Sequence, residues 1–263
     1  MQSTLRQPTL FVSHGAPTMA LEPGKAGAAL SALGKRLQRP SSILIISPHW
    51  DTPSAVVSSA GQPETIHDFH GFPAPLYELR YPAPGAPALA RRVSALLQAA
   101  GIACTSDPAR GLDHGAWSPL RFLFPEADIP VTQLSLQSQR EPGYQLGVGK
   151  ALAPLRDENV LVIGSGSMTH NLSEFRGKRF DSPPQPYVTQ FQEWFARRIG
   201  ARQMDELLDY RQRAPNAQRA HPEDEHLLPL FIAMGANGES GEVEHLVNEV
   251  IYGMLAMDAY IFH

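Results

Sequence analysis

At residues 42–50 the chain reads Ser42-Ile43-Leu44-Ile45-Ile46-Ser47-Pro48-His49-Trp50. Four consecutive aliphatic residues, three of them β-branched, predict a strand buried on both faces, as in parallel sheets. Pro48 has no N–H to donate, so we expect it to end this strand. His49 would then follow the carboxyl end of a central strand, where open α/β sheets place their ligand sites. For this stretch alone, a capping or packing histidine is the alternative.

Two further predicted strands are each followed by a histidine at short range. Residues 9–12 form an apolar strand that leads directly into Ser13-His14-Gly15-Ala16-Pro17. Residues 160–163 repeat the buried-strand pattern and continue into Gly164-Ser165-Gly166-Ser167-Met168-Thr169-His170-Asn171-Leu172. The glycines there match neither a P-loop nor the dinucleotide fingerprint. We interpret them as a tight turn at which the backbone approaches another segment closely.

These three histidines are expected at one edge of one sheet. Residues 25–38 carry Ala and Leu at helical spacing, which predicts a crossover helix in a right-handed βαβ unit. The carboxyl ends of parallel strands meet at the same edge of a sheet. His14, His49 and His170 should therefore lie close together.

A fourth histidine lies in the stretch His221-Pro222-Glu223-Asp224-Glu225-His226-Leu227-Leu228. The stretch predicts a helix start, because Pro222 suits the first helical position and three acidic residues favour the positive end of the helix. These carboxylates need no catalytic explanation. His226 would lie one turn into the helix and could face the same pocket.

Converging imidazoles are a recognised kind of metal site. Imidazole nitrogens suit zinc, iron, copper and nickel. Three neutral histidines with open coordination positions make a catalytic rather than a structural centre. The fourth histidine could either ligate the metal or act as an acid or base, since its unperturbed pKa is near neutrality.

The rest of the chain predicts one α/β domain spanning residues 1–263, with a central, mostly parallel sheet flanked by helices and the metal site at the carboxyl ends of the strands. The chain is 43% hydrophobic and 18% charged, and no polar or low-complexity linker divides it. The remaining expected elements are helices at 88–100, 144–155 and 187–199, strands at 102–105 and 129–136, and a returning edge strand near residue 263.

Composition and charge exclude several classes of partner. The net charge is −4, and no cluster of Lys and Arg lies beside aromatic residues, so we do not expect a nucleic acid partner. Cys104 is the only cysteine, which excludes an internal disulfide; we expect it to be buried and inert rather than nucleophilic. The sequence shows neither a signal peptide nor an 18-residue apolar run, so we expect a cytoplasmic protein without a membrane partner.

Other candidate groups lie in loops. Residues 61–87 are rich in Pro, Gly and aromatics without periodicity, which predicts an ordered flap beside a pocket. Its His67 and His70 are either metal ligands or surface histidines. Asp113 precedes His114 and could orient its imidazole. Ser165 or Ser167 could be a hydrolase nucleophile, although the nucleophile-elbow pattern is absent.

Five of these motifs, taken in order, resemble the 4,5-DOPA extradiol dioxygenase family of LigB-like (class III) ring-cleaving dioxygenases. The motifs run from residue 13 to residue 231 and cover nearly the whole chain. They are Ser13-His14-Gly15-Ala16-Pro17, Ser47-Pro48-His49-Trp50, Asp113-His114-Gly115, Gly164-Ser165-Gly166 with His170-Asn171-Leu172, and His221-Pro222 through His226.

The resemblance implies a metal-dependent enzyme that opens a catechol, DOPA-like or otherwise substituted, beside its diol with O₂. The implied metal ligands are His14, His49 and His226, and His170 is a ligand or a nearby base. His170 and His114 would be the catalytic residues, and the substrate side would comprise His114, Trp50 and Ser165. A carboxylate on the substrate could meet Arg80, Arg110 or Arg121, which are otherwise surface arginines.

The implied ligand set departs from the two-histidine, one-carboxylate triad of many non-haem iron oxygenases, because His226 takes the third position with Glu225 beside it. We expect Fe(II) to support activity and Zn(II) to be bound in the isolated protein, since zinc binds such sites more tightly. Two alternatives stay open: a zinc-dependent hydrolase, and a non-enzymatic metal-binding protein like Memo. Homo-oligomerisation also stays open.

Overall fold

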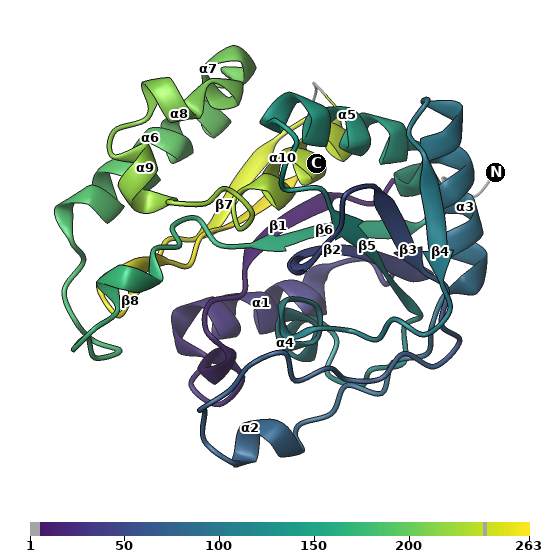
Figure 1. The fold of residues 1–263 in the computed structure, drawn as a ribbon, viewed down its shortest axis with the longest axis horizontal. Helices are drawn as coiled ribbons and strands as arrows, with labels where there is room; N and C mark the ends of the chain where they lie inside the picture. Colours follow the sequence, from purple (N-terminus) through teal and green to yellow (C-terminus); the bar gives the residue numbers. More distant parts are fainter. Residues whose placement is uncertain (1–5, 239–240) are drawn as a thin grey trace.

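The structure is a computed structural model that describes residues 6–238 and 241–263. Its centre is one eight-stranded sheet, with a short hairpin of β8 (Val250–Ile251) and β9 (Leu255–Ala256) outside it. The strands of the sheet are β1 (Thr9–Ser13), β2 (Ser42–Asp51), β3 (Ala55–Ser58), β4 (Cys104–Asp107), β5 (Val131–Leu136), β6 (Val160–Gly166), β7 (Val243–Val247) and β10 (Ala259–Phe262). Their spatial order is β4-β3-β5-β2-β6-β1-β10-β7 (Figure 1).

Helices cover both faces of this sheet. The longer ones are α1 (Gly24–Arg36), α3 (Pro87–Ala99), α4 (His114–Leu123), α5 (Pro142–Leu152), α6 (Pro186–Gly200) and α10 (Leu228–Asn237). The short ones are α2 (Pro75–Glu78), α7 (Met204–Leu208), α8 (Tyr210–Arg213), α9 (Ala217–Ala220) and the 3₁₀ turns η1 (Pro17–Ala20), η2 (Ala153–Glu158) and η3 (Leu172–Glu174). In Figure 1, α1 and α4 lie below the sheet, while α5 and α10 lie above it.

The middle of the sheet is parallel, because β5, β2, β6 and β1 pair in register with the same direction. Every residue of β1, β5 and β6 is buried, as expected for strands covered on both faces. This parallel part is flanked by antiparallel neighbours, β10 beside β1 and β3 beside β5, and β7 and β4 form the outer edges. The predicted single-domain α/β class with a mostly parallel sheet is confirmed.

The prediction that Pro48 ends its strand is wrong, since β2 continues to Asp51. The ladder between β2 and β6 does stop at Ile46, and the ladder to β5 shifts register between Ser47 and Asp51. Because the regular ladder is interrupted here, no backbone hydrogen bond requires the N–H that Pro48 lacks. His49 therefore lies on an extension of β2 past the parallel ladder.

Two other expectations for the C-terminal half are also wrong. The last strand, β10, is not an edge strand, because β7 pairs outside it. Residues 221–227 form turns rather than a helix, and α10 begins only at Leu228 with Pro229 in its first turn. The carbonyl of His226 accepts a hydrogen bond from the Ser167 N–H at 2.8 Å, which binds this segment to β6 and keeps it out of the helix.

The segment at residues 61–87 is packed, as predicted for an ordered flap. It contains α2, and Phe69, Leu76 and Tyr81 are buried within it. Cys104 is buried in β4 and forms no disulfide, as expected. Within the described ranges, no helix combines the length and the apolar character needed to cross a bilayer.

Gly164 and Gly166 lie inside β6 rather than in a turn, and the predicted close approach is confirmed. A Cβ on Gly166 would lie 2.0 Å from the carbonyl oxygen of His226.

We expect Gly166→Ala to lower the free energy of unfolding by about 1–3 kcal/mol, because the backbone at His226 must move away. Urea unfolding tests this. Gly147→Ala is the matched control, since nothing lies within 4 Å of its new Cβ; destabilisation of both variants alike would contradict the explanation.

Candidate metal centre

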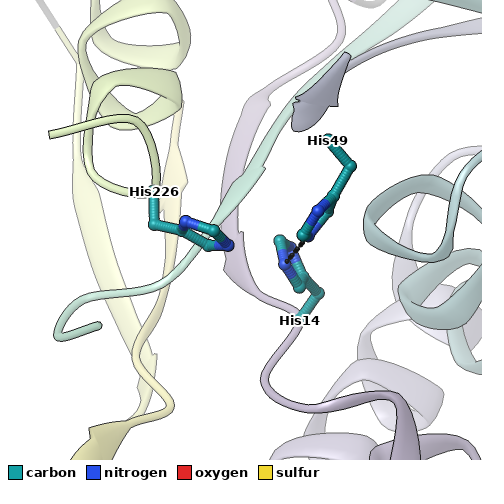
Figure 2. Close-up of side chains that lie close together, drawn as sticks. All are labelled: His14, His49 and His226. Carbon is teal, nitrogen blue, oxygen red and sulfur yellow. Dashed lines mark hydrogen bonds between the residues drawn. The ribbon is translucent and has the colours of Figure 1, made fainter. Parts of the chain in front are cut away.

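Three histidines from separate parts of the chain meet at the carboxyl edge of the parallel strands. His14 follows β1, His49 lies at the end of β2, and His226 precedes α10. Their ligand atoms all lie within 4.8 Å of one another, and the Nε2 atoms of His14 and His49 are 3.1 Å apart. Figure 2 shows the ring of His226 pointing toward the other two.

The outer nitrogens of two of these rings have partners that fix which nitrogen carries the proton. The Ser165 hydroxyl donates to the Gly115 carbonyl, so it accepts from Nδ1–H of His14 at 2.9 Å. The Glu225 carboxylate accepts from Nδ1–H of His226 at 2.8 Å. Each Nε2 is thereby left with a free lone pair directed at the centre of the cluster.

The environment keeps these imidazoles neutral. Burial lowers the pKa of His14 and of His226 well below the ordinary value, and neighbouring histidines lower both further. Burial and His114 lower the pKa of His49 to about 3, against the opposing effect of Asp68. Metal ligation requires the neutral form of histidine.

The arrangement fits a metal ion. The Nε2 atoms of His14 and His49 lie 3.1 Å apart: with a proton on Nε2 of His49 they form a hydrogen bond, and without it both lone pairs can bind one cation. Nitrogens bound at about 2.0–2.1 Å to one ion lie roughly 2.8–3.4 Å apart for bond angles between 90° and tetrahedral. The residues present can therefore hold one ion through His14, His49 and His226, with further coordination positions open.

His114 adjoins this cluster on the side of His49. It begins α4, it is 5% exposed, and its ring centroid lies 4.0 Å from that of His49. Asp113 does not orient it, because its carboxylate caps α4 and accepts from the Ala116 N–H. The partner of His114 is Asp68 in the flap, a residue for which the sequence offered no signal.

His170 adjoins the cluster on the opposite side. Its ring stacks on that of His226, with centroids 3.5 Å apart and planes 13° from parallel. Its Nδ1 lies 3.7 Å from the Glu225 carboxylate. Burial, and to a smaller extent the nearby His221 and His114, lower the pKa of His170 to about 3. A cavity of about 320 Å³ adjoins it, lined by His170, Asn171, Leu172, Ser173, Pro222, Glu223 and Glu225.

The predicted substrate residues Trp50 and Ser165 lie around the cluster in different settings. Ser165 is fully buried behind His14. Trp50 is 9% exposed, and the guanidinium of Arg110 lies 4.9 Å over its ring while pairing with Asp113.

Other candidates from the sequence lie away from the three-histidine cluster. His67 hydrogen-bonds the Leu79 carbonyl, and His70 is exposed; neither belongs to a metal-type group among the described residues. Arg80 and Arg121 bond to backbone carbonyls at the surface. The Ser167 hydroxyl donates to the Thr169 carbonyl.

We expect Ser165→Ala to weaken metal binding by about 10–100-fold, because His14 loses the acceptor that sets its tautomer and ring orientation. Competition with a chromophoric chelator measures this affinity. The exposed Ser54→Ala change removes the same hydroxyl elsewhere and should leave affinity at the wild-type value. Equal affinity of the two variants would contradict a role for Ser165 in holding His14.

Comparisons with known proteins agree on one family. Residues 8–261 match the sequence profile described as the catalytic LigB subunit of aromatic ring-opening dioxygenase. The chain is 41% identical to a 4,5-DOPA dioxygenase extradiol of Beta vulgaris, over 97% of this chain and 96% of that one. It is 38% identical to the Escherichia coli protein of that name, over 98% and 95%. A crystal structure of an uncharacterized Escherichia coli K12 protein superimposes with a TM-score of 0.81 at 31% identity, covering 98% and 100% of the two chains.

Proposed function

The chain belongs to the LigB family of aromatic ring-opening dioxygenases, and we propose that it opens a catechol beside its two hydroxyl groups with O₂. The observation that carries this proposal is the convergence of three neutral imidazoles, with two more histidines beside them. The names of the relatives favour a DOPA-like catechol as the substrate.

The metal would be held through Nε2 of His14, His49 and His226. When bound, Fe(II) would supply Lewis-acid and electron-transfer chemistry for the reaction of a catechol with O₂. We propose Fe(II) as the active metal and Zn(II) as the ion retained on isolation, since zinc ranks above iron in affinity for such donors.

The protein's own contribution is proton transfer and the exclusion of water. A catechol must lose protons to become a good electron donor, and a neutral imidazole accepts a proton efficiently near neutral pH. His114 and His170 stand on two sides of the ligand cluster and can each receive a hydroxyl proton. His14 and His226 are buried and His49 is partly buried, which limits the access of water to the site.

Anaerobic reconstitution tests this function. Metal-free protein is loaded with Fe(II), mixed with 3,4-dihydroxyphenylalanine without oxygen, and then exposed to air. We expect a yellow ring-opened product and uptake of one O₂ per catechol, with no product from zinc-loaded protein. A zinc hydrolase would need no O₂, and a binding protein would give no product. Fully iron-loaded protein that consumes no O₂ would overturn the proposal.

A further inference from the structure

Asp68 in the flap accepts two hydrogen bonds from His114. A carboxylate commonly orients a catalytic histidine in this way. Its Oδ2 lies 2.8 Å from Nδ1 of the His114 ring, and its Oδ1 accepts from the His114 backbone N–H at 2.8 Å. Building on the function proposed above, we propose that Asp68 is a positioning residue that holds His114 as the Nδ1–H tautomer, so that Nε2 is the atom that exchanges protons with the substrate.

The chemistry of the pair determines the tautomer. Oδ1 of the Asp68 carboxylate accepts the His114 backbone N–H, and Oδ2 faces Nδ1 of the ring at 2.8 Å. An ionised carboxylate only accepts hydrogen bonds. Nδ1 of His114 must therefore carry the proton, and Nε2 of the neutral ring has a free lone pair.

The position of His114 allows the Nε2 lone pair to accept a proton from a bound substrate. The ring is nearly buried, 4.0 Å from the ring of His49 and 5.3 Å from the ring of His14 by centroid distance. A catechol bound beside those two ligands would lie within reach of His114 Nε2. A mixture of tautomers at this position would place a proton on Nε2 in part of the molecules and block proton acceptance there.

The flap holds the carboxylate in place. Asp68 has a side-chain exposure of 20%, and the next residue, Phe69, is buried with its ring edge-on to His114 at 5.7 Å. The same Oδ2 lies 3.5 Å from Nδ1 of His49, beyond its distance to His114. The shorter distance shows that the carboxylate pairs with His114 rather than with His49. Because Asp68 belongs to the flap, His114 is oriented only when the flap is packed in this conformation.

Asp68→Asn separates the tautomer effect from simple loss of packing. The amide oxygen can still accept from the His114 backbone N–H, while the amide NH₂ replaces the acceptor facing Nδ1. A donor at that place favours the opposite tautomer, with the proton on Nε2. The variant has nearly the same shape, so it changes the hydrogen-bond polarity and the charge at this position while keeping the packing.

The first readout needs no turnover. Two-bond ¹⁵N–¹H spectra of histidine-labelled, zinc-loaded protein report the protonated nitrogen of each ring. We expect His114 to carry its proton on Nδ1 in the wild type and on Nε2 in Asp68→Asn. A wild-type His114 protonated on Nε2, or an unchanged tautomer in the variant, would overturn the proposal.

The second readout is steady-state kinetics of the iron-loaded enzyme with 3,4-dihydroxyphenylalanine. We expect Asp68→Asn to lower kcat by about 10–100-fold with KM near the wild-type value, and Asp68→Glu to recover part of the loss. Glu78→Gln removes one exposed carboxylate from the same flap and should leave both constants unchanged. Unchanged kcat in Asp68→Asn would overturn the proposal. A loss of bound metal as large as the loss of kcat would also overturn it, because Asp68 would then act on the ligand His49 rather than on His114. Inactive wild-type enzyme would refute the catechol function, while the tautomer spectra would still decide the role of Asp68.

Discussion

Replacing His226 with alanine is expected to abolish metal retention and ring opening together. His226 supplies one of the three nitrogens in the group with His14 and His49, and its removal leaves two of them. The loss of one of three donors should lower metal affinity by on the order of 10³-fold. Metal content after dialysis and O₂ uptake with a catechol measure the two losses on the same samples.

His70→Ala is the matched control for that experiment. It removes the same side chain from an exposed position in the flap, outside the metal-type groups of the described residues. Its metal content and turnover should equal those of the wild type. A His226→Ala protein that keeps its metal and its activity would refute the three-histidine centre.

The convergence of His14 and His49 could be predicted from the sequence because it depends on local patterns. Runs such as residues 43–46 and 160–163 are aliphatic enough to identify strands covered on both faces. Parallel connection then places their carboxyl ends at one edge, and β2, β6 and β1 do lie side by side. The helices at 24–36, 87–99 and 186–200 also lie within two residues of the predicted bounds.

Contacts between distant side chains could not be predicted in this way. Asp68 lies in an aperiodic flap, 46 positions before His114, and nothing local distinguishes it from the other acidic residues. Ser165 was expected on the substrate side, whereas its hydroxyl is buried against His14, a pairing set by the registry between β1 and β6.

The errors at Pro48 and at residues 221–227 have a similar origin. Pro48 carries a strong local preference against strand pairing, which the shifted register of β2 and β5 accommodates. Pro222 and three acids carry a strong local preference for a helix start. The hydrogen bond from Ser167 to the His226 carbonyl and the contact with Gly166 override it, and they bring His226 to the metal centre.

The stacking of His170 on His226 bears on whether His170 is a ligand. The lone pair of an imidazole nitrogen lies in the plane of its ring. With planes 13° from parallel and centroids 3.5 Å apart, an ion in the plane of His226 lies well outside the plane of His170. Because metal–nitrogen bonds are about 2 Å long, this geometry favours His170 as a proton acceptor rather than a fourth ligand.

His170→Ala should therefore retain its metal while turnover falls by about 10²–10⁴-fold, the usual contribution of a positioned acid or base. Metal analysis and O₂ uptake with a catechol measure the two quantities. His170→Phe is the informative second variant, because its ring preserves the stack on His226 but accepts no proton. We expect it to be as inactive as His170→Ala. Recovery of turnover in His170→Phe would mean that His170 acts by packing, and loss of metal in both variants would make it a ligand.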